Sequence, residues 1–242
     1  MRVDTVIIGA GIVGLTTALR IKEYTPKKQV VVLEKNCAPF LETSRYNSGV
    51  VHSGIHQKPE LLKSQLARRG GPMLVDFCEK EGVRIQKSGM MIVVAPEDVM
   101  GLVGELKALW QLYRNSRAQG ITLQWMTQKE IRQKEPHLRA LFGIYMPVIW
   151  VVNQDSLGKK LSERVRKERG AHIVCNAPVC AITRKRNIYE VETREEKYQA
   201  EEVVNAAGVR ADEIAKQAGF PQYRIHTFRG EYYEVIGEKK SL

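Results

Sequence analysis

The spacing of apolar residues changes from one segment of the chain to the next. A run of β-branched residues at 3–8 is typical of a buried parallel strand, and apolar positions at helical spacing follow over 12–24. Pro26 lies just beyond that stretch and ends it, because proline cannot continue a helix. A second β-branched run at 29–33 then completes a strand–helix–strand unit.

The rest of the chain predicts further helices and several short strands. Helices are expected at 59–81, 96–117, 128–134, 156–169 and 211–219. Strands are expected at 89–95, 172–175, 179–184, 188–193, 203–205, 223–228 and 231–235. Thr127, with Glu130 three residues later, predicts a capping box at the start of one helix. The pattern favours an α/β fold, in which a Rossmann-like domain with a βαβ N-terminus is interrupted by a smaller α+β domain with a mixed or antiparallel sheet.

Charge changes this picture little. The chain has 38 lysines and arginines against 27 aspartates and glutamates, a formal net charge of +11. The basic residues are scattered and mostly alternate with acids, as they do over 162–169, which is typical of solvated helix faces. We therefore expect no nucleic-acid partner, whereas the positive charge is compatible with peripheral attachment to the inner face of an anionic membrane.

The cysteines and the apolar runs bear on the expected compartment. The spacing of Cys37, Cys78, Cys175 and Cys180 matches no CxxC pair and no metal-ligand pattern, so no metal site is predicted. No apolar run reaches the roughly 18 residues that cross a bilayer, and no segment has the pattern of a signal peptide. Reduced thiols in a cytoplasmic protein are the expectation. The sequence indicates no particular oligomeric state.

A glycine-rich motif follows the first predicted strand. Gly9, Gly11 and Gly14 form a GxGxxG pattern that opens the next helix, and Glu34 ends the second strand 20 residues after Gly14. In a dinucleotide site the first glycine permits a tight turn, the second lets the backbone approach the pyrophosphate, and the third lets helix and strand pack closely. An acid at that offset accepts hydrogen bonds from an adenosine ribose and repels the 2′-phosphate of NADP. The motif predicts a dinucleotide site, and NAD and FAD share it.

Two further segments have the composition of ligand contacts. The strand expected at 203–205 ends in small residues at 206–208, which allow either close approach of a ligand or simply a tight strand–helix connection. Residues 47–56 contain two glycines, two serines, an asparagine and two histidines without a helical or strand period. Such a segment either wraps a polar ligand, with His52 and His56 near the reacting atoms, or is a surface loop.

Together these motifs resemble the FAD-dependent oxidoreductases of the D-amino-acid-oxidase type, and most of all the L-2-hydroxyglutarate dehydrogenase/oxidase family. The resemblance is carried by segments 4–15, 47–56, 58–63, 134–136 and 228–233. The segment around His52 is the most specific, because glycine-rich motifs occur in many flavoproteins. The resemblance implies FAD as the cofactor and a small-molecule 2-hydroxy acid as the substrate.

The resemblance also implies where FAD is bound. The glycine motif would hold the pyrophosphate, Glu34 the ribose and Val179 the adenine, while the segment 44–52 would pass along the rest of the cofactor. The full set of implied contacts is Gly9, Gly11, Ile12, Val13, Gly14, Glu34, Lys35, Ser44, Arg45, Asn47, Ser48, Gly49, Val51, His52, Val179, Ala206, Ala207 and Gly208. The FAD-binding domain would comprise 1–82 and 148–223, and the substrate-side domain 83–147 and 224–242.

An enzyme of this family would oxidise L-2-hydroxyglutarate to 2-oxoglutarate by hydride transfer from the α-carbon to flavin N5. The reaction needs a base for the hydroxyl proton and a cation for the carboxylates. His52 or His56 is the candidate base, because histidine titrates near neutral pH. Arg229 is the candidate carboxylate ligand, with a structural ion pair as its alternative role.

Two departures from the family leave other functions open. The family is considerably longer than this chain, and Asn153 stands where the family tends to have an acid. A truncated dinucleotide-binding module without redox activity is therefore one alternative, as is one half of an enzyme that needs a partner chain. Another is an amine or amino-acid oxidase on the same scaffold, because a fold does not determine a substrate.

Overall fold

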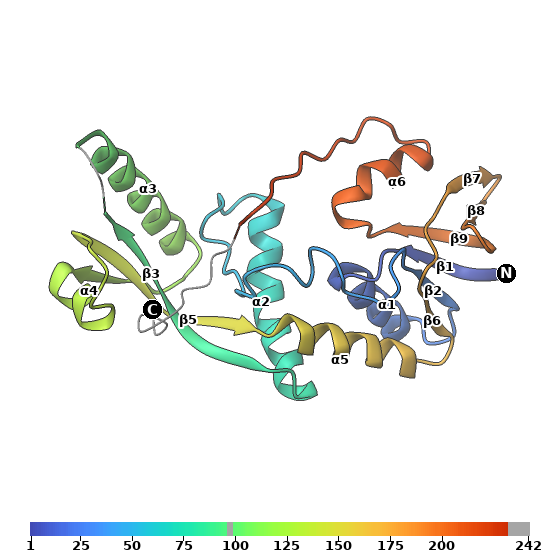
Figure 1. Ribbon diagram of the computed structural model, residues 1–242, viewed down its shortest axis with the longest axis horizontal. Coiled ribbons are helices and arrows are strands. Elements are labelled where there is room, and N and C mark those ends of the chain that lie inside the picture. The colour runs from blue at the N-terminus through green and yellow to red at the C-terminus, as the bar shows by residue number, and fades with distance from the viewer. Residues whose placement is uncertain (96–98, 232–242) are drawn as a thin grey trace. The chain divides into compact units, whose positions relative to one another are not determined.

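The computed structural model describes residues 1–95 and 99–231, which form two compact units (Figure 1). The first unit joins Met1–Asn47 to Gln154–Gly230, and the second contains Ser48–Asn153. Each unit has its own sheet, of six strands in the first and three in the second. The expected α/β fold, interrupted by a second sheet-containing unit, is confirmed.

The sheet of the first unit extends the N-terminal strand–helix–strand unit. In spatial order its strands are β6 (Ala171–Val174), β2 (Val30–Leu33), β1 (Arg2–Ile8), β9 (Lys197–Asn205), β8 (Ile188–Glu192) and β7 (Ala181–Lys185). The first four are parallel and the last two antiparallel. Every residue of β2 is buried, as expected of a parallel strand covered on both faces. Ile8 is paired with both Leu33 and Asn205, so the carboxyl ends of three strands meet at one edge.

Helices cover this sheet. They are α1 (Ile12–Tyr24), α5 (Gln154–Lys167) and α6 (Ala211–Gln217), with a short 3-10 helix η1 (Gly208–Arg210) before the last. Helices α1 and α5 contact each other (Figure 1). Ile214 of α6 belongs to a core cluster with Val31 and Val191 of the sheet. The edge at which β1, β2 and β9 end therefore rests on a packed apolar core.

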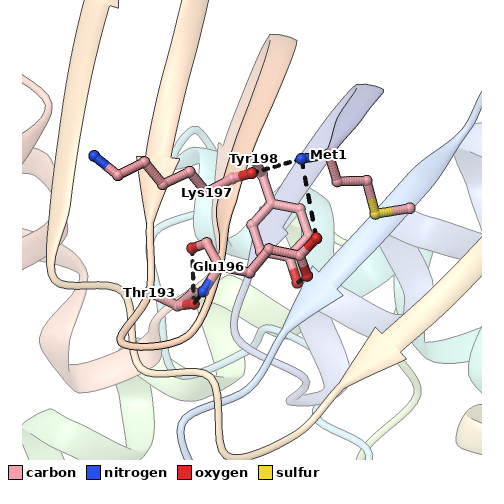
Figure 2. A network of polar contacts seen from close by, with 5 residues as sticks. All are labelled: Met1, Thr193, Glu196, Lys197 and Tyr198. Atoms are coloured by element: carbon pink, nitrogen blue, oxygen red, sulfur yellow. Dashed lines mark hydrogen bonds and ion pairs between the residues drawn. The ribbon is translucent and has the colours of Figure 1, made fainter.

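The turn between β8 and β9 lies at the other end of the parallel strands and is closed by polar contacts (Figure 2). Thr193 Oγ1 donates to the Glu196 carbonyl at 2.9 Å and accepts from the Glu196 N–H at 3.0 Å. The Tyr198 hydroxyl donates to Glu196 Oε2 at 2.8 Å. Burial, and then this carboxylate, raise the pKa of Tyr198 to about 12, so the phenol stays protonated near neutral pH. The network is structural.

The second unit is built on an antiparallel sheet. In the order β3-β5-β4 its strands are β3 (Ile85–Val94), β5 (Phe142–Val152) and β4 (Gln124–Thr127), and its helices are α2 (Leu62–Glu81), α3 (Val99–Ala118) and α4 (Gln128–Lys134). Leu109 of α3 packs with Val94 and Ile144 of the sheet. The capping box of α4 is confirmed, because Thr127 N donates to Glu130 Oε2 at 2.7 Å and Glu130 N to Thr127 Oγ1 at 3.4 Å.

Some strands differ from the expectation. The sequence does not predict β4, which is too short to show a period, or β5, in which Pro147 argues against a central strand. The strand expected at 223–228 is wrong, since the segment 223–230 carries no strand and Phe228 is 95% exposed. That segment has strand-like composition, but strands form only where a neighbouring strand pairs with them. The strand expected at 231–235 lies outside the described residues, apart from Glu231.

The two units divide the chain at other positions than the expected domains. Val50 bridges to Val151, and Val51 N donates to the Trp150 carbonyl at 2.9 Å, so the segment after residue 47 packs with β5. Residues 48–82 and 148–153 thus lie in the second unit, and 224–230 in the first. The assignment of FAD binding to 1–82 and 148–223 stays a prediction, and residues 232–242 of the expected substrate-side domain lie outside the described residues.

All four cysteines are free. Burial raises the pKa of the Cys78 thiol to about 11, so Cys78 is a poor nucleophile at neutral pH. Among the helices of the described residues, none is long and apolar enough to cross a lipid bilayer.

Candidate functional site

A glycine-rich turn lies where the carboxyl ends of β1, β2 and β9 meet. Gly9 has a φ of +104°, and a Cβ there would lie 2.5 Å from the carbonyl oxygen of Ala206. A Cβ at Gly11 would lie 2.9 Å from Ser44 Oγ, and one at Gly14 would overlap the carbonyl oxygen of Gly9. Backbone atoms therefore leave no room for a side chain at Gly9 and Gly14, whereas a Cβ at Gly11 would press on the hydroxyl of Ser44.

Helix α1 begins at this turn without a side-chain cap from its own N-cap residue, Gly11. The Ile12 N–H instead donates to Ser44 Oγ at 3.0 Å, across 32 positions of sequence. A helix leaves its first N–H groups without partners inside the helix, and its dipole favours a negative charge there. The start of α1 thus has the donors and the potential that bind a phosphate.

Glu34 is fixed at the end of β2 by two backbone N–H groups. Its Oε2 accepts from Ala10 N at 2.8 Å, and its Oε1 accepts from Asn36 N at 2.9 Å. The residue is only 6% exposed, and these donors compensate for the loss of water around the carboxylate. A carboxylate has about four acceptor positions, so Glu34 can also accept hydrogen bonds from ribose hydroxyls.

These elements line one cavity of about 400 Å³ within the first unit. Ten of the implied FAD contacts lie on it, namely Gly9, Gly11, Val13, Glu34, Lys35, Ser44, Val179, Ala206, Ala207 and Gly208. Mostly apolar walls with a few fixed polar groups are typical of a small-molecule site. The structure thus gathers residues from both ends of the sequence around a single cavity.

Other residues on this cavity are missed by the sequence reasoning. Glu42 forms a salt bridge with Lys35 at 2.7 Å, and hydrogen bonds from Lys35 and Asn36 hold the pKa of Glu42 below its usual range. Asn205 Oδ1 accepts from the Ala207 N–H at 3.3 Å and so shapes the small-residue turn. Asn205 had a signal, an amide at the carboxyl end of a strand, whereas Glu42 lies in an aperiodic segment that offered none.

His52 and His56 lie in a loop of the second unit, before α2. His52 lies on a second cavity, of about 450 Å³, together with Val51, Arg68 and Trp150. His56 is not on it. Although His56 lies at the surface, partial burial of its imidazole, and then the nearby His52, lower its pKa, so the imidazole is neutral at neutral pH. A neutral imidazole is the form that can accept a proton.

The remaining candidates lie on neither of these two cavities: Ile12, Gly14, Arg45, Asn47, Ser48, Gly49, His56 and Arg229. Arg45 forms a salt bridge with Asp155 at 2.8 Å, which fastens the segment after β2 to α5. Arg229 is exposed in the extended segment that follows α6. The expected roles of the two histidines and of Arg229 in catalysis stay predictions.

The first cavity fits the adenosine and pyrophosphate parts of FAD. Its glycine turn has no room for a Cβ at Gly9 or Gly14, the start of α1 offers donors for phosphate, and Glu34 is positioned at the end of the adjacent strand. These features define a dinucleotide-binding α/β protein.

Comparison with known proteins identifies the family. Residues 4–241 match the model of the DAO family of FAD-dependent oxidoreductases, so the chain belongs to that family, whose cofactor is FAD. L-2-hydroxyglutarate dehydrogenase of Escherichia coli (strain K12) is 31% identical over 241 residues, which cover 99% of this chain and 56% of that protein. The mitochondrial L-2-hydroxyglutarate dehydrogenase of Homo sapiens is 30% identical over 250 residues, covering 98% and 52%. The expected resemblance is confirmed, and the chain spans little more than half the length of these curated relatives.

Solved structures agree with this assignment. L-α-glycerophosphate oxidase from Mycoplasma pneumoniae with FAD bound superposes with a TM-score of 0.82 at 26% identity, covering 90% of this chain and 57% of that one. Glycine oxidase from Geobacillus kaustophilus gives a TM-score of 0.78 at 21% identity, covering 90% and 58%, and shows the fold alone. The family and the FAD-bound structure support the expected cofactor.

Proposed function

We propose that this protein, with FAD bound, oxidises a 2-hydroxy acid to the 2-oxo acid, and that the substrate is L-2-hydroxyglutarate. The observation that carries the proposal is the similarity to L-2-hydroxyglutarate dehydrogenases over 99% of the chain. The cavity at the glycine turn supports it, because its residues fit the required cofactor. Bound FAD would supply the group that accepts the hydride released from the α-carbon of the substrate.

The first unit contributes binding rather than chemistry. The N–H groups at the start of α1 would hold the pyrophosphate, with Ser44 beside them. Glu34 would accept hydrogen bonds from the adenosine ribose while its backbone donors keep it oriented.

The histidine loop of the second unit, which carries His52 and His56, would contribute the proton acceptor. Oxidation of a hydroxyl group requires that its proton be removed, and a base does this only in its deprotonated form. Since the pKa of His56 is lowered, its base form persists to more acidic pH than that of an ordinary histidine, whose pKa is about 6.5. His52, which lies on the second cavity, is the other candidate for this role.

The visible spectrum of the purified protein tests this proposal. Flavin absorption that bleaches when L-2-hydroxyglutarate is added without oxygen is the expected result, with D-2-hydroxyglutarate as the stereochemical control. Bleaching by glycine alone would indicate an amine oxidase, and bleaching by L-α-glycerophosphate alone a different hydroxyl substrate. A protein that takes up FAD and is bleached by none of these would be a binding module, which would contradict the proposal.

Peripheral attachment to an anionic membrane is a separate proposal that rests on the net charge of +11. Sedimentation with vesicles containing phosphatidylglycerol, compared with neutral vesicles at the same ionic strength, tests it. Equal recovery in the two pellets would contradict it.

A further inference from the structure

The loop that carries His52 and His56 is tied to two helices of its own unit by buried polar side chains. Asn115 of α3 is 6% exposed, and its Nδ2 donates to the carbonyls of Ile55 at 2.9 Å and Gln57 at 3.3 Å. These two carbonyls flank His56. One side-chain amide therefore holds the backbone on both sides of a candidate base.

A second contact acts one residue earlier in the loop. Ser64 of α2 is 1% exposed, and its Oγ donates to the Gly54 carbonyl at 3.2 Å. Gly54 has a φ of +90°, and a Cβ there would lie 3.0 Å from the Ser64 carbonyl oxygen, so α2 and the loop are in direct contact. Three carbonyls between Gly54 and Gln57 are thus bound by side chains from two helices.

Two further amides complete this arrangement. Gln111 Nε2 donates to Asn115 Oδ1 at 2.9 Å, which fixes the orientation of the Asn115 amide. Gln119 Oε1 lies 3.1 Å from Ser64 Oγ, while Gln119 Nε2 is buried without a partner among the described residues. Turning the Gln119 amide over would let Nε2 donate to Ser64 Oγ, which would leave the serine hydroxyl free to donate to Gly54.

We propose that Ser64 and Asn115 are positioning residues, which act through the 54–57 backbone to hold His56 in the geometry that proton transfer requires. The proposal rests on the proposed function for its chemical meaning, and on hydrogen bonds within one compact unit for its geometry. The Ile55 side chain is fully buried and anchors the loop by apolar packing, but packing does not fix how His56, the next residue, is turned. Hydrogen bonds to the carbonyls on either side of His56 do, because they are directional.

The test compares Ser64→Ala and Asn115→Leu with Ser162→Ala. Ser162 is an equally buried serine of α5 whose hydroxyl donates to the Gly158 carbonyl at 2.8 Å, so it controls for loss of a helical serine hydroxyl. In each protein, NMR would follow the imidazole titrations and the hydrogen exchange of the 54–57 amides. His56→Gln assigns the His56 signal.

In the Ser64 and Asn115 variants we expect faster exchange at 54–57 and a rise in the pKa of His56 toward about 6.5. Ser162→Ala should change neither the exchange at 54–57 nor the His56 titration. If folded Ser64 and Asn115 variants keep the wild-type exchange and the wild-type His56 titration, the proposal is overturned. Should Asn115→Leu fail to fold, Ser64→Ala decides by itself, because it removes a single hydroxyl.

Turnover separates this proposal from the proposed function. In the flavin-loaded protein, Ser64→Ala and Asn115→Leu should lower kcat with L-2-hydroxyglutarate by up to about 100-fold at unchanged flavin content. If the substrate never reduces the flavin of the wild type, yet the variants show the NMR changes, the proposed function is contradicted and the positioning role stands. An active wild type whose variants keep kcat and the His56 titration would contradict the positioning role alone.

Discussion

The nucleotide cavity of the first unit and the histidine loop of the second are constructed in different ways. The cavity depends on missing side chains at fixed offsets, with Gly9 and Gly14 allowing backbone to contact backbone. The loop depends on side chains that reach it from helices, with Ser64 and Asn115 supplying the donors. The first kind of site is encoded locally, so it can be read from a short motif. The second depends on Ser64, 10 positions from its partner, and on Asn115, 60 positions from its partner, so no short motif reveals it.

Replacing the histidines of the loop should have the largest effect on turnover. Replacing the histidine that serves as base, in His52→Gln or His56→Gln, should lower turnover by about 10²–10⁴-fold, the usual contribution of general acid–base catalysis. Steady-state kinetics with L-2-hydroxyglutarate at fixed flavin occupancy measure this. His137→Gln, in the same unit, is the control. Unchanged turnover in both loop variants would remove the loop from the chemistry.

A single methyl group in the glycine turn should have the next largest effect. Gly9→Ala would add both an unfavourable positive φ and a clash with the Ala206 carbonyl, which together should cost at least about 3 kcal/mol of the free energy of unfolding or of flavin binding. Urea unfolding and flavin retention on gel filtration measure it. Gly104→Ala is the matched control, because its Cβ meets no atom within 4 Å and a helix gains up to about 1 kcal/mol from the exchange. Equal stability and equal flavin retention in the two variants would contradict the importance of the glycine turn.

Glu34 offers a finer test of the same cavity. Glu34→Ala should raise the dissociation constant for FAD by about 10–100-fold, since hydrogen bonds to a charged group contribute about 1.5–3 kcal/mol. Fluorescence titration of the flavin-free protein measures it. Glu23→Ala, which removes an exposed carboxylate paired with Arg20, should leave flavin affinity as in the wild type. A Glu34 variant with wild-type affinity would mean that the ribose is bound elsewhere.

The smallest effect should be on how the free energy of unfolding depends on acidic pH, and it should come from His56 in the histidine loop. Because the folded protein lowers the pKa of His56, the unfolded chain binds more protons there in the window between that lowered pKa and about pH 6.5. The free energy of unfolding should therefore fall as the pH drops through that range, and less steeply in His56→Gln. Urea unfolding at several pH values measures both slopes. Parallel slopes would show that His56 titrates alike in the folded and unfolded states.

The sequence predicted the parallel core and its glycine turn, because strand burial and glycine spacing are properties of neighbouring residues. The helix over 12–24 was predicted to the residue, and the capping box at Thr127 was correct. The strand expected at 223–228 was wrong, because its composition suits a strand but the structure provides no pairing for it. Ser64 and Asn115 could not have been singled out, since a buried serine or asparagine is identified as such only when the helices around it are in place.

The way Ser44 and Glu34 are held has a consequence for how the cofactor enters. Ser44 already accepts from the first amide of α1, and Glu34 already accepts from two loop amides, all with protein partners alone. These contacts would hold the adenosine end of FAD on groups that the protein itself orients, so binding should lose little entropy to ordering of the chain. Flavin removed under mild conditions should accordingly be taken up again quickly, in a single kinetic phase, and ADP alone should compete with it for the same cavity.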